Sequence, residues 1–476
     1  MSEFKKTKII ATLGPSSNNP EIISEMISAG MNVARINMSH FQNTFDFENL
    51  VKIIRSESDK LKIHIGILVD LAGPKIRLNL DSVNNNQFTM KANEIYTLGY
   101  GSQNDLPINC NIKFNQIIKK KSYIKINDGK TILEIIKNDT DRLFVKSLNK
   151  TVLENRKGVN FPDIDIDINP VTENDKKHIL LAIKNNVDWL ALSFVRKNTD
   201  INPIIDIFKK ENHYIPIIAK IEKPEAILNL KSIIDTFNGI LIARGDLGVE
   251  VPLAELPGLQ KKIIGDCRKS KKPVIVATQM LESMIENSSP TRAEVNDVAN
   301  AVYESADAVM LSGETAIGQY PVESIRIMND ILLNAEHEIF KNKISENISI
   351  EVDQDTRSAI GEAVKLISNH LNIDAIVVMT ESGNTGIIVS HYRPKNQIFA
   401  LTPNKSICNK LSLVWGIVPI LTKEFKSTDE MIKQSQKILV ENSLLKLGCT
   451  FVLTAGVPIG ISSSTNMLKI HKIENN

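Results

Sequence analysis

The stretch from Ile215 to Gly248 reads IPIIAKIEKPEAILNLKSIIDTFNGILIARGDLG and contains two short apolar runs, each followed at once by charged residues. The runs are Ile215–Ala219 and Gly239–Ala243, and the segment between them is long enough for a helix. Both runs are apolar almost throughout, which is typical of parallel strands that are buried on both faces. The stretch therefore predicts consecutive strand–helix units of a parallel sheet.

Further runs of the same kind occur along the chain, and the total is eight. Helical patterns separate most of them. In Pro20–Ala29 the apolar residues fall on one face and Gly30 follows as a C-terminal stop, and Leu256–Ser270 shows a similar periodicity. Eight strand–helix units predict an α/β fold of the (β/α)₈ TIM-barrel type. The other six runs are Lys8–Leu13, Met31–Ile36, Ile63–Val69, Val187–Leu192, Pro273–Ala277 and Ala306–Leu311.

The repeat breaks after the third run, where residues 74–165 show strand and turn patterns instead. Tyr123–Ile126 and Ile132–Ile136 flank the turn Asn127-Asp128-Gly129, which predicts a β-hairpin. An all-β insertion after a barrel strand lies over the barrel mouth, and that position suits a lid. We therefore expect a barrel catalytic domain of residues 1–73 and 166–345, with residues 74–165 as an inserted small β-barrel lid domain.

Residues 346–476 show a new α/β pattern and are expected to form a third, C-terminal domain. Thr356–Leu371 has the periodicity of a helix, and short connectors join the strands that follow it. Short connectors between alternating strands and helices are typical of an open sheet. The expected strands are Asp374–Met379, Gln397–Leu401, Ile417–Leu421, Thr450–Leu453 and Met467–Lys472.

The composition narrows the class of protein. The chain has 476 residues, which is more than one core of roughly 250–300 residues holds. Lys plus Arg number 57 and Asp plus Glu number 55, so the net charge of +2 argues against a nucleic-acid or membrane-surface protein. The one basic cluster, Lys119–Lys121, is interpreted as a solvated turn. We find no signal-like N-terminus and no apolar run near the roughly 18 residues that span a bilayer, and we expect a cytoplasmic protein.

The four cysteines lie far apart and form no CxxC pair. The sequence therefore indicates neither a zinc site nor a disulfide framework. They are Cys110, Cys267, Cys408 and Cys449.

Polar and charged residues follow every predicted barrel strand. In this fold the active site lies at the C-terminal ends of the strands, where buried charges are costly unless they are paired or bind a ligand. Glu222 and Asp246 follow neighbouring strands, so their carboxylates could share a divalent cation such as Mg²⁺ or Mn²⁺. A salt-bridged rim is the alternative, but the adjacent Lys220 and Arg244 favour a metal and phosphate site.

Arg35, Lys220 and Arg244 supply positive charge at the same strand ends. Phosphoryl transfer needs charge neutralisation and alignment, and a fixed lysine beside a metal ion meets that need. Arg244 has a second interpretation, in which it holds its loop by pairing with an acid. The turn Ala243–Asp246 opens a short helix whose N–H groups suit a carboxylate or phosphate. Thr278 ends a strand and is interpreted either as a substrate or proton-relay group or as a structural residue.

Taken in order, these motifs resemble the pyruvate kinase family over essentially the whole chain. Each motif is weak alone, but their shared order and spacing leave little room for coincidence. The resemblance implies the transfer of a phosphoryl group from phosphoenolpyruvate to ADP, which gives pyruvate and ATP in glycolysis. The matching motifs are Ile218–Glu222, Ile242–Glu250, Ala277–Met284, Pro290–Glu294 and Met310–Thr315.

The resemblance implies a role for each residue near the reacting phosphate. Lys220 would stabilise the phosphoryl group in flight, and Arg35 would contact the transferred phosphate. Glu222 and Asp246 would ligate the Mg²⁺ or Mn²⁺ ion that also holds phosphoenolpyruvate.

The resemblance also implies where the two substrates bind. The N–H groups around Gly245 and Asp246, together with Thr278 and with Arg244 beside them, would hold the substrate carboxylate. Thr278 would also lie near the enolate face that a water chain protonates. Residues around the nucleotide and its metal would be Pro15, His40, Arg77 and Lys157, and Asp128 of the lid would swing in on closure.

One departure from the family concerns its monovalent cation, K⁺. The family's ligands match Asn37, Ser39, Asp70 and the carbonyl of Leu71, but Lys75 stands where potassium-dependent members carry Glu. Leu71, Ala72 and Leu78 also match the potassium-independent class. We therefore expect the Lys75 ammonium to supply the charge that K⁺ otherwise brings, and K⁺ not to be required. A hinge lysine that points to solvent is the alternative.

The C-terminal domain carries a loop of hydroxyls and a glycine after a strand, formed by Thr380, Ser382, Gly383 and Thr385. The family uses the matching loop for sugar-phosphate effectors, and a nucleotide effector also suits such a loop. An ordinary strand–helix turn is the alternative. The resemblance further implies allosteric regulation and a homotetramer, and the balanced charge argues against a nucleic-acid or membrane partner.

Two rival functions differ in what they explain. A metal-dependent aldolase acting on phosphoenolpyruvate or pyruvate would explain Glu222 and Asp246 but not the lid residues Arg77, Asp128 and Lys157. An inactive relative that senses metabolites would be expected to have lost a charged strand end, and none is missing.

Overall fold

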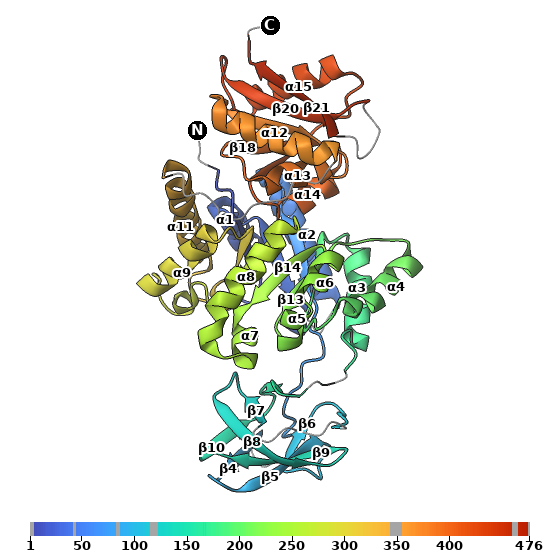
Figure 1. Ribbon diagram of the computed structural model, residues 1–476, viewed down its shortest axis with the longest axis vertical. Helices are drawn as coiled ribbons and strands as arrows, with labels where there is room; N and C mark the ends of the chain where they lie inside the picture. The colour runs from blue at the N-terminus through green and yellow to red at the C-terminus, as the bar shows by residue number, and fades with distance from the viewer. Residues whose placement is uncertain are drawn as a thin grey trace.

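The computed structural model describes residues 4–40, 44–81, 86–114, 122–164, 166, 168–342, 355–458 and 465–474. Three bodies lie one after another along the longest axis, with the all-β insertion at one end, the barrel in the middle and the C-terminal domain at the other end (Figure 1). The cluster Lys119–Lys121, which was predicted to be a solvated turn, lies outside the described residues.

The central body is a closed barrel of eight parallel strands in the order β1-β16-β15-β14-β13-β12-β3-β2, which confirms the predicted (β/α)₈ fold. Neighbouring strands are aligned so that Ala243 pairs with Ala277 and Arg35 pairs with Leu68. The ends that carry the charged residues therefore meet on one rim. The strands are β1 Lys8–Thr12, β2 Val33–Asn37, β3 Gly66–Asp70, β12 Trp189–Leu192, β13 Ile217–Ile221, β14 Gly239–Ala243, β15 Val274–Ala277 and β16 Ala308–Leu311.

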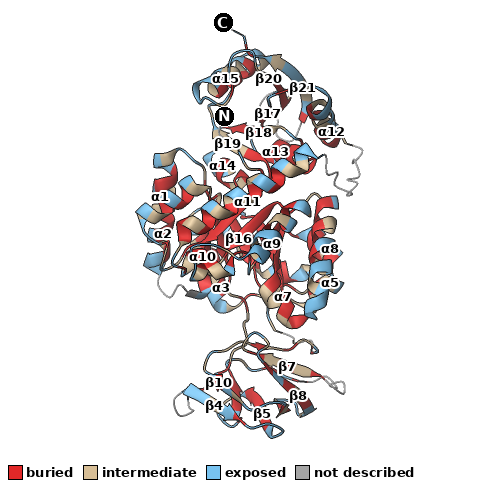
Figure 2. Cartoon of the chain, turned by 90° about the vertical axis from the view of Figure 1, so that its left-hand side faces the viewer, coloured by how far each residue is buried: buried red, intermediate tan, exposed pale blue. Residues whose placement is uncertain are grey.

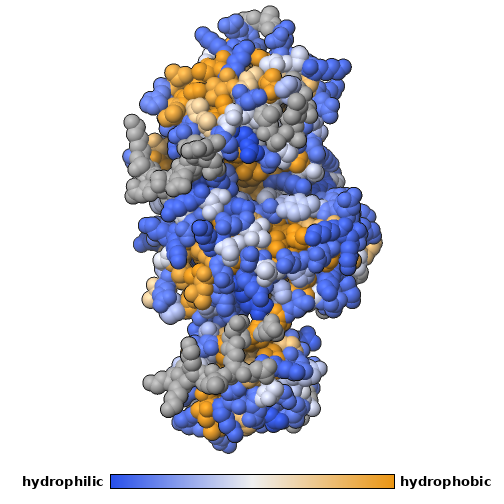
Figure 3. All heavy atoms as spheres, turned by 45° about the vertical axis from the view of Figure 1, so that its right-hand side comes forward, coloured by the Kyte–Doolittle hydropathy of each residue, from blue (hydrophilic) through white to orange (hydrophobic). Residues whose placement is uncertain are grey.

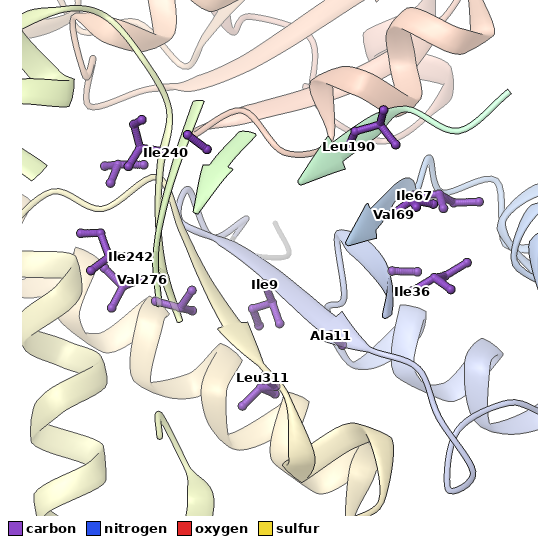
Figure 4. Packing of buried hydrophobic residues seen from close by; sticks show 14 of the residues in the cluster. Ile9, Ala11, Ile36, Ile67, Val69, Leu190, Ile240, Ile242, Val276 and Leu311 are labelled. Atoms are coloured by element: carbon purple, nitrogen blue, oxygen red, sulfur yellow. The ribbon is translucent and has the colours of Figure 1, made fainter. Parts of the chain in front are cut away.

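The barrel strands are apolar throughout because both of their faces are buried. Ile9 and Ala11 of β1 pack with the surrounding helices, whereas Ile10 between them belongs to the cluster inside the barrel. Figure 4 shows the outer set, which includes Ile36, Val69 and other residues of neighbouring strands. Figure 2 shows the same burial along the barrel strands.

Helices surround the barrel, and capping residues define several of their ends. Asn19 caps α1 by accepting a hydrogen bond from the N–H of Ile22, and Gly30 ends that helix with φ of 120°, as predicted. The helices are α1 Pro20–Ala29, α2 Thr44–Leu61, α3 Glu173–Lys184, α4 Asn202–Glu211, α5 Pro224–Leu228, α6 Leu230–Thr236, α7 Arg244–Glu250, α8 Leu256–Lys269, α9 Arg292–Tyr303, α10 Gly313–Ala316 and α11 Pro321–Lys341, with 3₁₀ turns at Met38–His40, Asn198–Ile201, Leu253–Glu255 and Glu282–Ile285.

The insertion is all-β and has its own apolar core, which includes Leu98, Ile124 and Val145. In the part that is described, its strands pair as a six-stranded sheet in the order β11-β7-β8-β9-β5-β6 and a two-stranded sheet of β10 and β4. The predicted hairpin is present, with positive φ at Asn127 and Asp128 in its turn. The strands are β4 Gln87–Met90, β5 Ile95–Tyr100, β6 Leu106–Ile108, β7 Tyr123–Ile126, β8 Thr131–Asn138, β9 Arg142–Ser147, β10 Thr151–Glu154 and β11 Val159–Asn160.

The C-terminal domain is an open five-stranded sheet in the order β19-β18-β17-β20-β21, with β21 antiparallel to β20. Apolar clusters cover both of its faces, as the predicted open sheet requires. Its elements are α12 Thr356–His370, β17 Ala375–Met379, α13 Asn384–His391, β18 Gln397–Thr402, α14 Lys405–Leu411, β19 Ile417–Leu421, α15 Thr428–Glu441, β20 Thr450–Gly456 and β21 Thr465–Lys472.

This domain packs against the N-terminal ends of the barrel strands, opposite the charged rim. The Lys8 ammonium donates to the carbonyl of Ile417 at 2.7 Å, and the indole of Trp189 donates to the carbonyl of Lys410 at 3.2 Å. On the face drawn in Figure 3, hydrophobic residues gather on the C-terminal domain. Within the described residues, the helices are all too short or too polar to cross a membrane.

Candidate active site

Strands β2, β3, β12 and β13 bring a compact charged network to the C-terminal rim of the barrel. Its centre is Lys220, the fourth residue of β13. The Lys220 ammonium lies 2.9 Å from Glu222 Oε1, 3.3 Å from Asp70 Oδ1 and 2.9 Å from the hydroxyl of Ser193. Burial opposes its charge, but Asp70 and Glu222 outweigh burial and hold the pKa of Lys220 above its usual value. The side chain is therefore a permanent cation.

Asp70 ends β3 and links Lys220 to a second cation. Arg35 donates to Asp70 Oδ2 from Nε at 2.8 Å and from Nη2 at 2.6 Å, and its Nη1 donates to the hydroxyl of Thr12 at 2.8 Å. Burial favours the neutral form of Asp70, yet Lys220 and Arg35 together keep the pKa of Asp70 below its usual value. A single buried carboxylate thus orients both of the cations predicted to act on the phosphate.

Asp246 lies close enough to Glu222 for its charge to act on the Glu222 carboxylate. Burial raises the pKa of Glu222, and the charge of Asp246 raises it further, against the opposing effect of Lys220. Glu222 Oε2 also accepts the backbone N–H of Phe194 at 2.7 Å. Asp246 is more open, and its Oδ1 lies 3.5 Å from the ammonium of Lys75. Repulsion between two neighbouring carboxylates is the condition that a divalent cation relieves.

Thr278 follows β15 and touches the first turn of α7. Its backbone has φ of +70°, and its hydroxyl accepts the N–H of Gly245 at 2.7 Å and donates to the carbonyl of Ala277 at 2.5 Å. A threonine rarely adopts this backbone conformation, and such strain concentrates at functional sites. The structure thus brings Thr278 beside Gly245, one residue from Asp246, although the Gly245 N–H already has a partner.

Arg244 holds this loop in place. Its Nη1 pairs with Asp297 of α9 at 2.6 Å, and its Nη2 donates to the carbonyl of Thr278 at 2.7 Å and to that of Gln279 at 3.3 Å. These contacts match the loop-holding interpretation of Arg244 that the sequence left open.

Comparison with known proteins identifies the family. The family model described as "Pyruvate kinase, barrel domain" matches residues 4–325, and that described as "Pyruvate kinase, alpha/beta domain" matches residues 358–471. The chain belongs to the pyruvate kinase family. The sequence-based prediction of a phosphotransferase that acts on phosphoenolpyruvate and ADP is thereby confirmed.

Individual relatives agree with this membership. The chain is 39% identical over 477 residues to a pyruvate kinase of Staphylococcus haemolyticus (strain JCSC1435), which covers 99% of this chain and 81% of the relative. It is 38% identical over 479 residues to a pyruvate kinase of Staphylococcus aureus (strain MRSA252), with the same coverage. The crystal structure of a pyruvate kinase from Cryptosporidium parvum matches with a TM-score of 0.90 at 31% identity, and the match covers 98% of this chain and 96% of that one.

The residues predicted to surround the nucleotide lie partly in the inserted domain and partly on the barrel. In the inserted domain, Arg77 donates to the carbonyl of Arg156 at 3.0 Å, and Lys157 pairs with Glu154 at 2.9 Å. Pro15 follows β1 on the barrel rim. The backbone of His40 ends a 3₁₀ turn, but its side chain lies outside the described part of the structure.

The inserted domain meets the barrel at α7, the helix that carries Asp246. Lys125 of β7 donates to the carbonyl of Val249 at 2.5 Å, and Asn160 of β11 donates to Glu250 Oε1 at 2.7 Å. Glu250 Oε1 also pairs with Lys223 at 2.5 Å. Asp128 lies in the β7–β8 turn, next to Gly129, at which an added Cβ would lie 3.9 Å from Val249.

The residues predicted for a monovalent cation site already have partners within the protein. The side-chain oxygen of Asn37 accepts the N–H of Ser39 at 3.1 Å, and the carbonyl of Leu71 accepts the hydroxyl of Ser193 at 2.7 Å. Asp70 is engaged by Arg35 and Lys220 as described above. Lys75 contacts Asp246 and is not joined to the predicted K⁺ ligands by any bond recorded among the described residues.

The predicted effector loop precedes α13 in the C-terminal domain. The hydroxyl of Thr380 accepts the N–H of Gly383, which has φ of +91°, at 2.8 Å. The hydroxyl of Thr385 lies 2.7 Å from that of Thr465, whereas Ser382 is exposed. These bonds shape the strand–helix turn and leave the Ser382 side chain accessible.

Sequence reasoning did not assign roles to three residues that contact the predicted site residues directly. Ser193 bonds Lys220, Thr12 bonds Arg35, and Asp297 pairs with Arg244. Ser193 directly follows a barrel strand, within Leu192–Phe194. The expectation that active-site residues follow barrel strands therefore covers Ser193, but it does not separate Ser193 from the other polar residues at strand ends. Asp297 lies within a helix, where an acidic residue carries no distinctive signal.

Proposed function

We propose that the enzyme carries out phosphoryl transfer at the rim formed by Lys220, Glu222, Asp246 and Thr278. The observation that supports this most strongly is the Lys220 ammonium, which is buried, permanently charged and fixed between Asp70 and Glu222. A fixed cation of this kind neutralises the charge that spreads over the oxygens of a transferring phosphoryl group. Arg35, which shares Asp70, is positioned to bind the same phosphate.

The reaction breaks the bond between phosphorus and the enol oxygen of phosphoenolpyruvate and forms one between phosphorus and an oxygen of the ADP β-phosphate. The electron pair of the broken bond remains on the enolate, and a proton added at its terminal carbon completes pyruvate. Thr278 lies beside Gly245 and Asp246 and is proposed to orient the substrate carboxylate and the water that delivers this proton.

Glu222 and Asp246 are the residues that would hold the divalent metal, Mg²⁺ or Mn²⁺. Their mutual repulsion supports this assignment, and Mg²⁺ is typically held by one or two carboxylates together with substrate oxygens and water. The described residues contain no cluster of three or more His, Cys, Asp or Glu, which fits a site completed by substrate. When bound, the metal would supply positive charge to the phosphate and enolate oxygens.

The remaining substrate contacts are proposed from the inserted domain. Arg77, Lys157 and Asp128 would reach the nucleotide when this domain closes as a lid over the rim, with Pro15 and His40 on the barrel side. Contacts between the inserted domain and α7 support this coupling, because α7 carries Asp246. Lid closure would also exclude water, which competes with ADP for the phosphoryl group.

K⁺ is proposed to be unnecessary, with Lys75 supplying the charge. Two observations support this: Lys75 reaches Asp246, and the carbonyl of Leu71 and the carboxylate of Asp70 are already satisfied by protein donors. The side-chain oxygen of Asn37 likewise already accepts the backbone N–H of Ser39.

We also propose the domain division 1–73 with 166–345, 74–165 and 346–476, which the separate apolar cores support. The C-terminal domain would bind a sugar-phosphate or nucleotide effector at Thr380–Thr385 and assemble a homotetramer in the cytoplasm. Exposed large apolar side chains on this domain, including Leu366 and Leu447, support assembly.

A coupled lactate dehydrogenase assay with phosphoenolpyruvate, ADP and Mg²⁺ tests the activity, and Lys220→Met tests the site. The wild-type chain should form pyruvate only when ADP and metal are both present, and the variant should lose about 10²–10³-fold or more in kcat. Lys262→Met, a change at an exposed lysine of α8, serves as the control. Full activity of Lys220→Met would refute the site, and pyruvate formation without ADP would refute the reaction.

A further inference from the structure

The hydroxyl of Ser193 lies at the centre of the hydrogen bonds around Lys220. Ser193 follows β12 directly, and only 3% of its surface is exposed. Its Oγ lies 2.9 Å from the Lys220 ammonium and 2.7 Å from the carbonyl oxygen of Leu71, with Asp70 Oδ1 farther away at 3.3 Å.

The direction of this hydroxyl is fixed by its neighbours. The Lys220 ammonium can only donate, so Ser193 must accept from it and use its single hydrogen elsewhere. The carbonyl of Leu71 is the nearer acceptor. Leu71 is in turn tied to the barrel, because its N–H donates to the carbonyl of Ala191 at 3.0 Å. Backbone pairing between the end of β3 and β12 therefore orients the lone pair that Ser193 presents to Lys220.

The Lys220 ammonium has one acceptor for each of its three hydrogens, and Ser193 is the only uncharged acceptor among the three. The ammonium has three hydrogens, and Glu222, Ser193 and Asp70 lie within 2.9–3.3 Å of its nitrogen. Without the hydroxyl, one N–H would lose its acceptor in a buried site, and the two carboxylates would be free to draw the ammonium toward themselves. The Ser193 hydroxyl therefore fixes the position of the Lys220 ammonium between the carboxylates of Asp70 and Glu222.

We propose that Ser193 is a positioning residue, whose hydroxyl, held by the Leu71 carbonyl, directs the Lys220 ammonium and yields its place when a phosphoryl oxygen arrives. The ammonium is attracted more strongly to the two carboxylates, which carry the opposite charge, than to the neutral hydroxyl, so exchange at Ser193 costs least. The inference rests on the proposed role of Lys220. It explains how a buried lysine with a full set of partners remains available to the substrate.

The test compares Ser193→Ala and Ser193→Thr with the wild-type chain under saturating Mg²⁺. Ser193→Ala should lower kcat about 10- to 100-fold, because a small misplacement of a catalytic charge is costly, while the KM for ADP stays close to the wild-type value. Ser193→Thr keeps the hydroxyl and should recover most of the rate. Ser390→Ala is the matched control, since Ser390 is equally buried and donates to the carbonyl of Trp415 at 2.6 Å in the C-terminal domain.

Melting temperatures separate a positioning role from a structural one. Ser193→Ala and Ser390→Ala should lose similar stability, and only the former should lose rate. Equal kinetics for these two variants, or equal loss in Ser193→Ala and Ser193→Thr, would overturn the proposal. Should Ser193→Ala fail to fold, Ser193→Cys keeps the side chain's shape with a somewhat larger, weakly hydrogen-bonding group, and it should show the same loss of kcat.

Lys220→Met, measured in the same series, distinguishes the two levels of inference. An active Lys220→Met would remove the proposed role of Lys220 and the role of Ser193 with it. An inactive Lys220→Met together with an unimpaired Ser193→Ala would leave the site intact and overturn the positioning role alone.

Discussion

The ammonium nitrogen of Lys75 lies 3.5 Å from Oδ1 of Asp246, so one ion pair joins the start of the inserted domain to the proposed metal site. The two side chains are 36% and 32% exposed, so the pair contributes little to stability. Its importance lies in charge: Lys75 places a fixed cation beside a carboxylate that is proposed to bind a metal.

Replacing this cation should change the enzyme's need for K⁺. The wild-type chain should be fully active when tetramethylammonium replaces K⁺ at equal ionic strength. Lys75→Glu adds a carboxylate where the cation stood, so its activity should fall and be restored about tenfold or more by K⁺, a difference of about 1.4 kcal/mol. Initial rates in the coupled assay, with and without K⁺, measure the effect.

Lys177→Glu is the control for this prediction, because Lys177 is an exposed lysine that lines the same cleft of about 930 Å³ as Lys75. It makes the same change in charge without contacting Asp246. A wild-type chain that is silent without K⁺ would contradict the replacement of K⁺ by Lys75, as would equal K⁺ activation of both variants.

Neutralising Glu222 should weaken metal binding as well as catalysis. Glu222→Gln removes a proposed ligand and one of the two carboxylates that hold Lys220, so kcat should fall about 10²–10³-fold. Mn²⁺ titration followed by electron paramagnetic resonance should show weaker binding. Glu57→Gln is the control, since Glu57 is also buried but pairs with Lys60 on α2, and unchanged Mn²⁺ affinity in Glu222→Gln would count against the metal site.

The sequence predicted the barrel well because strands buried on both faces are apolar without interruption. The sequence did not predict the strand boundaries as well, since apolar residues also precede the strands. Ile63–Val69 was predicted as one strand, but β3 spans Gly66–Asp70, and Ile63 is 42% exposed while Ile65 packs in the core before the strand begins. Apolar character alone does not separate a strand from the turn that leads into it.

The location of the site was also predictable, because the ends of parallel strands must share one rim. The partners within the site were not. Arg244 and Asp297 are 53 residues apart, and Lys220 and Ser193 are 27 apart, so no local spacing links them. These residues stand on separate strands, helices and strand ends, so they share no periodic signal, and only the closed barrel determines which of them meet.

The pair of Arg244 and Asp297 should act as one unit that supports the Thr278 loop. If Arg244 works by holding this loop, Arg244→Ala and Asp297→Ala should each lower kcat/KM for phosphoenolpyruvate by about tenfold, and the double variant should be little worse than either. The resulting coupling energy should be about 1 kcal/mol or more. A further large loss on adding Arg244→Ala to Asp297→Ala would instead indicate direct contact between Arg244 and substrate.

Lys8, at the floor of the barrel, should lower the stability of the fold at neutral pH. Its ammonium is buried against the C-terminal domain, and burial, aided by the neighbouring charge of Lys5, lowers the pKa of Lys8 to about 7 despite the opposing effect of Glu336. Because the unfolded chain keeps the ordinary value near 10.5, unfolding takes up protons between about pH 7 and 10.5. The cost of burying this charge is therefore fully present below pH 7 and is relieved as the pH rises.

Lys8→Met should consequently melt several degrees above the wild type at pH 6.5, since about 1 kcal/mol corresponds to roughly 2–4 °C in a domain of this size. This difference in melting temperature should shrink toward pH 9.5, where Lys8 of the folded wild type is neutral. Lys261→Met, at an exposed position of α8, controls for the general effect of pH on the melting temperature. Differential scanning calorimetry at both pH values gives the double difference. An advantage of Lys8→Met that stays constant with pH would show that it comes from packing of the methionine, and that the charge state of Lys8 does not change across this range.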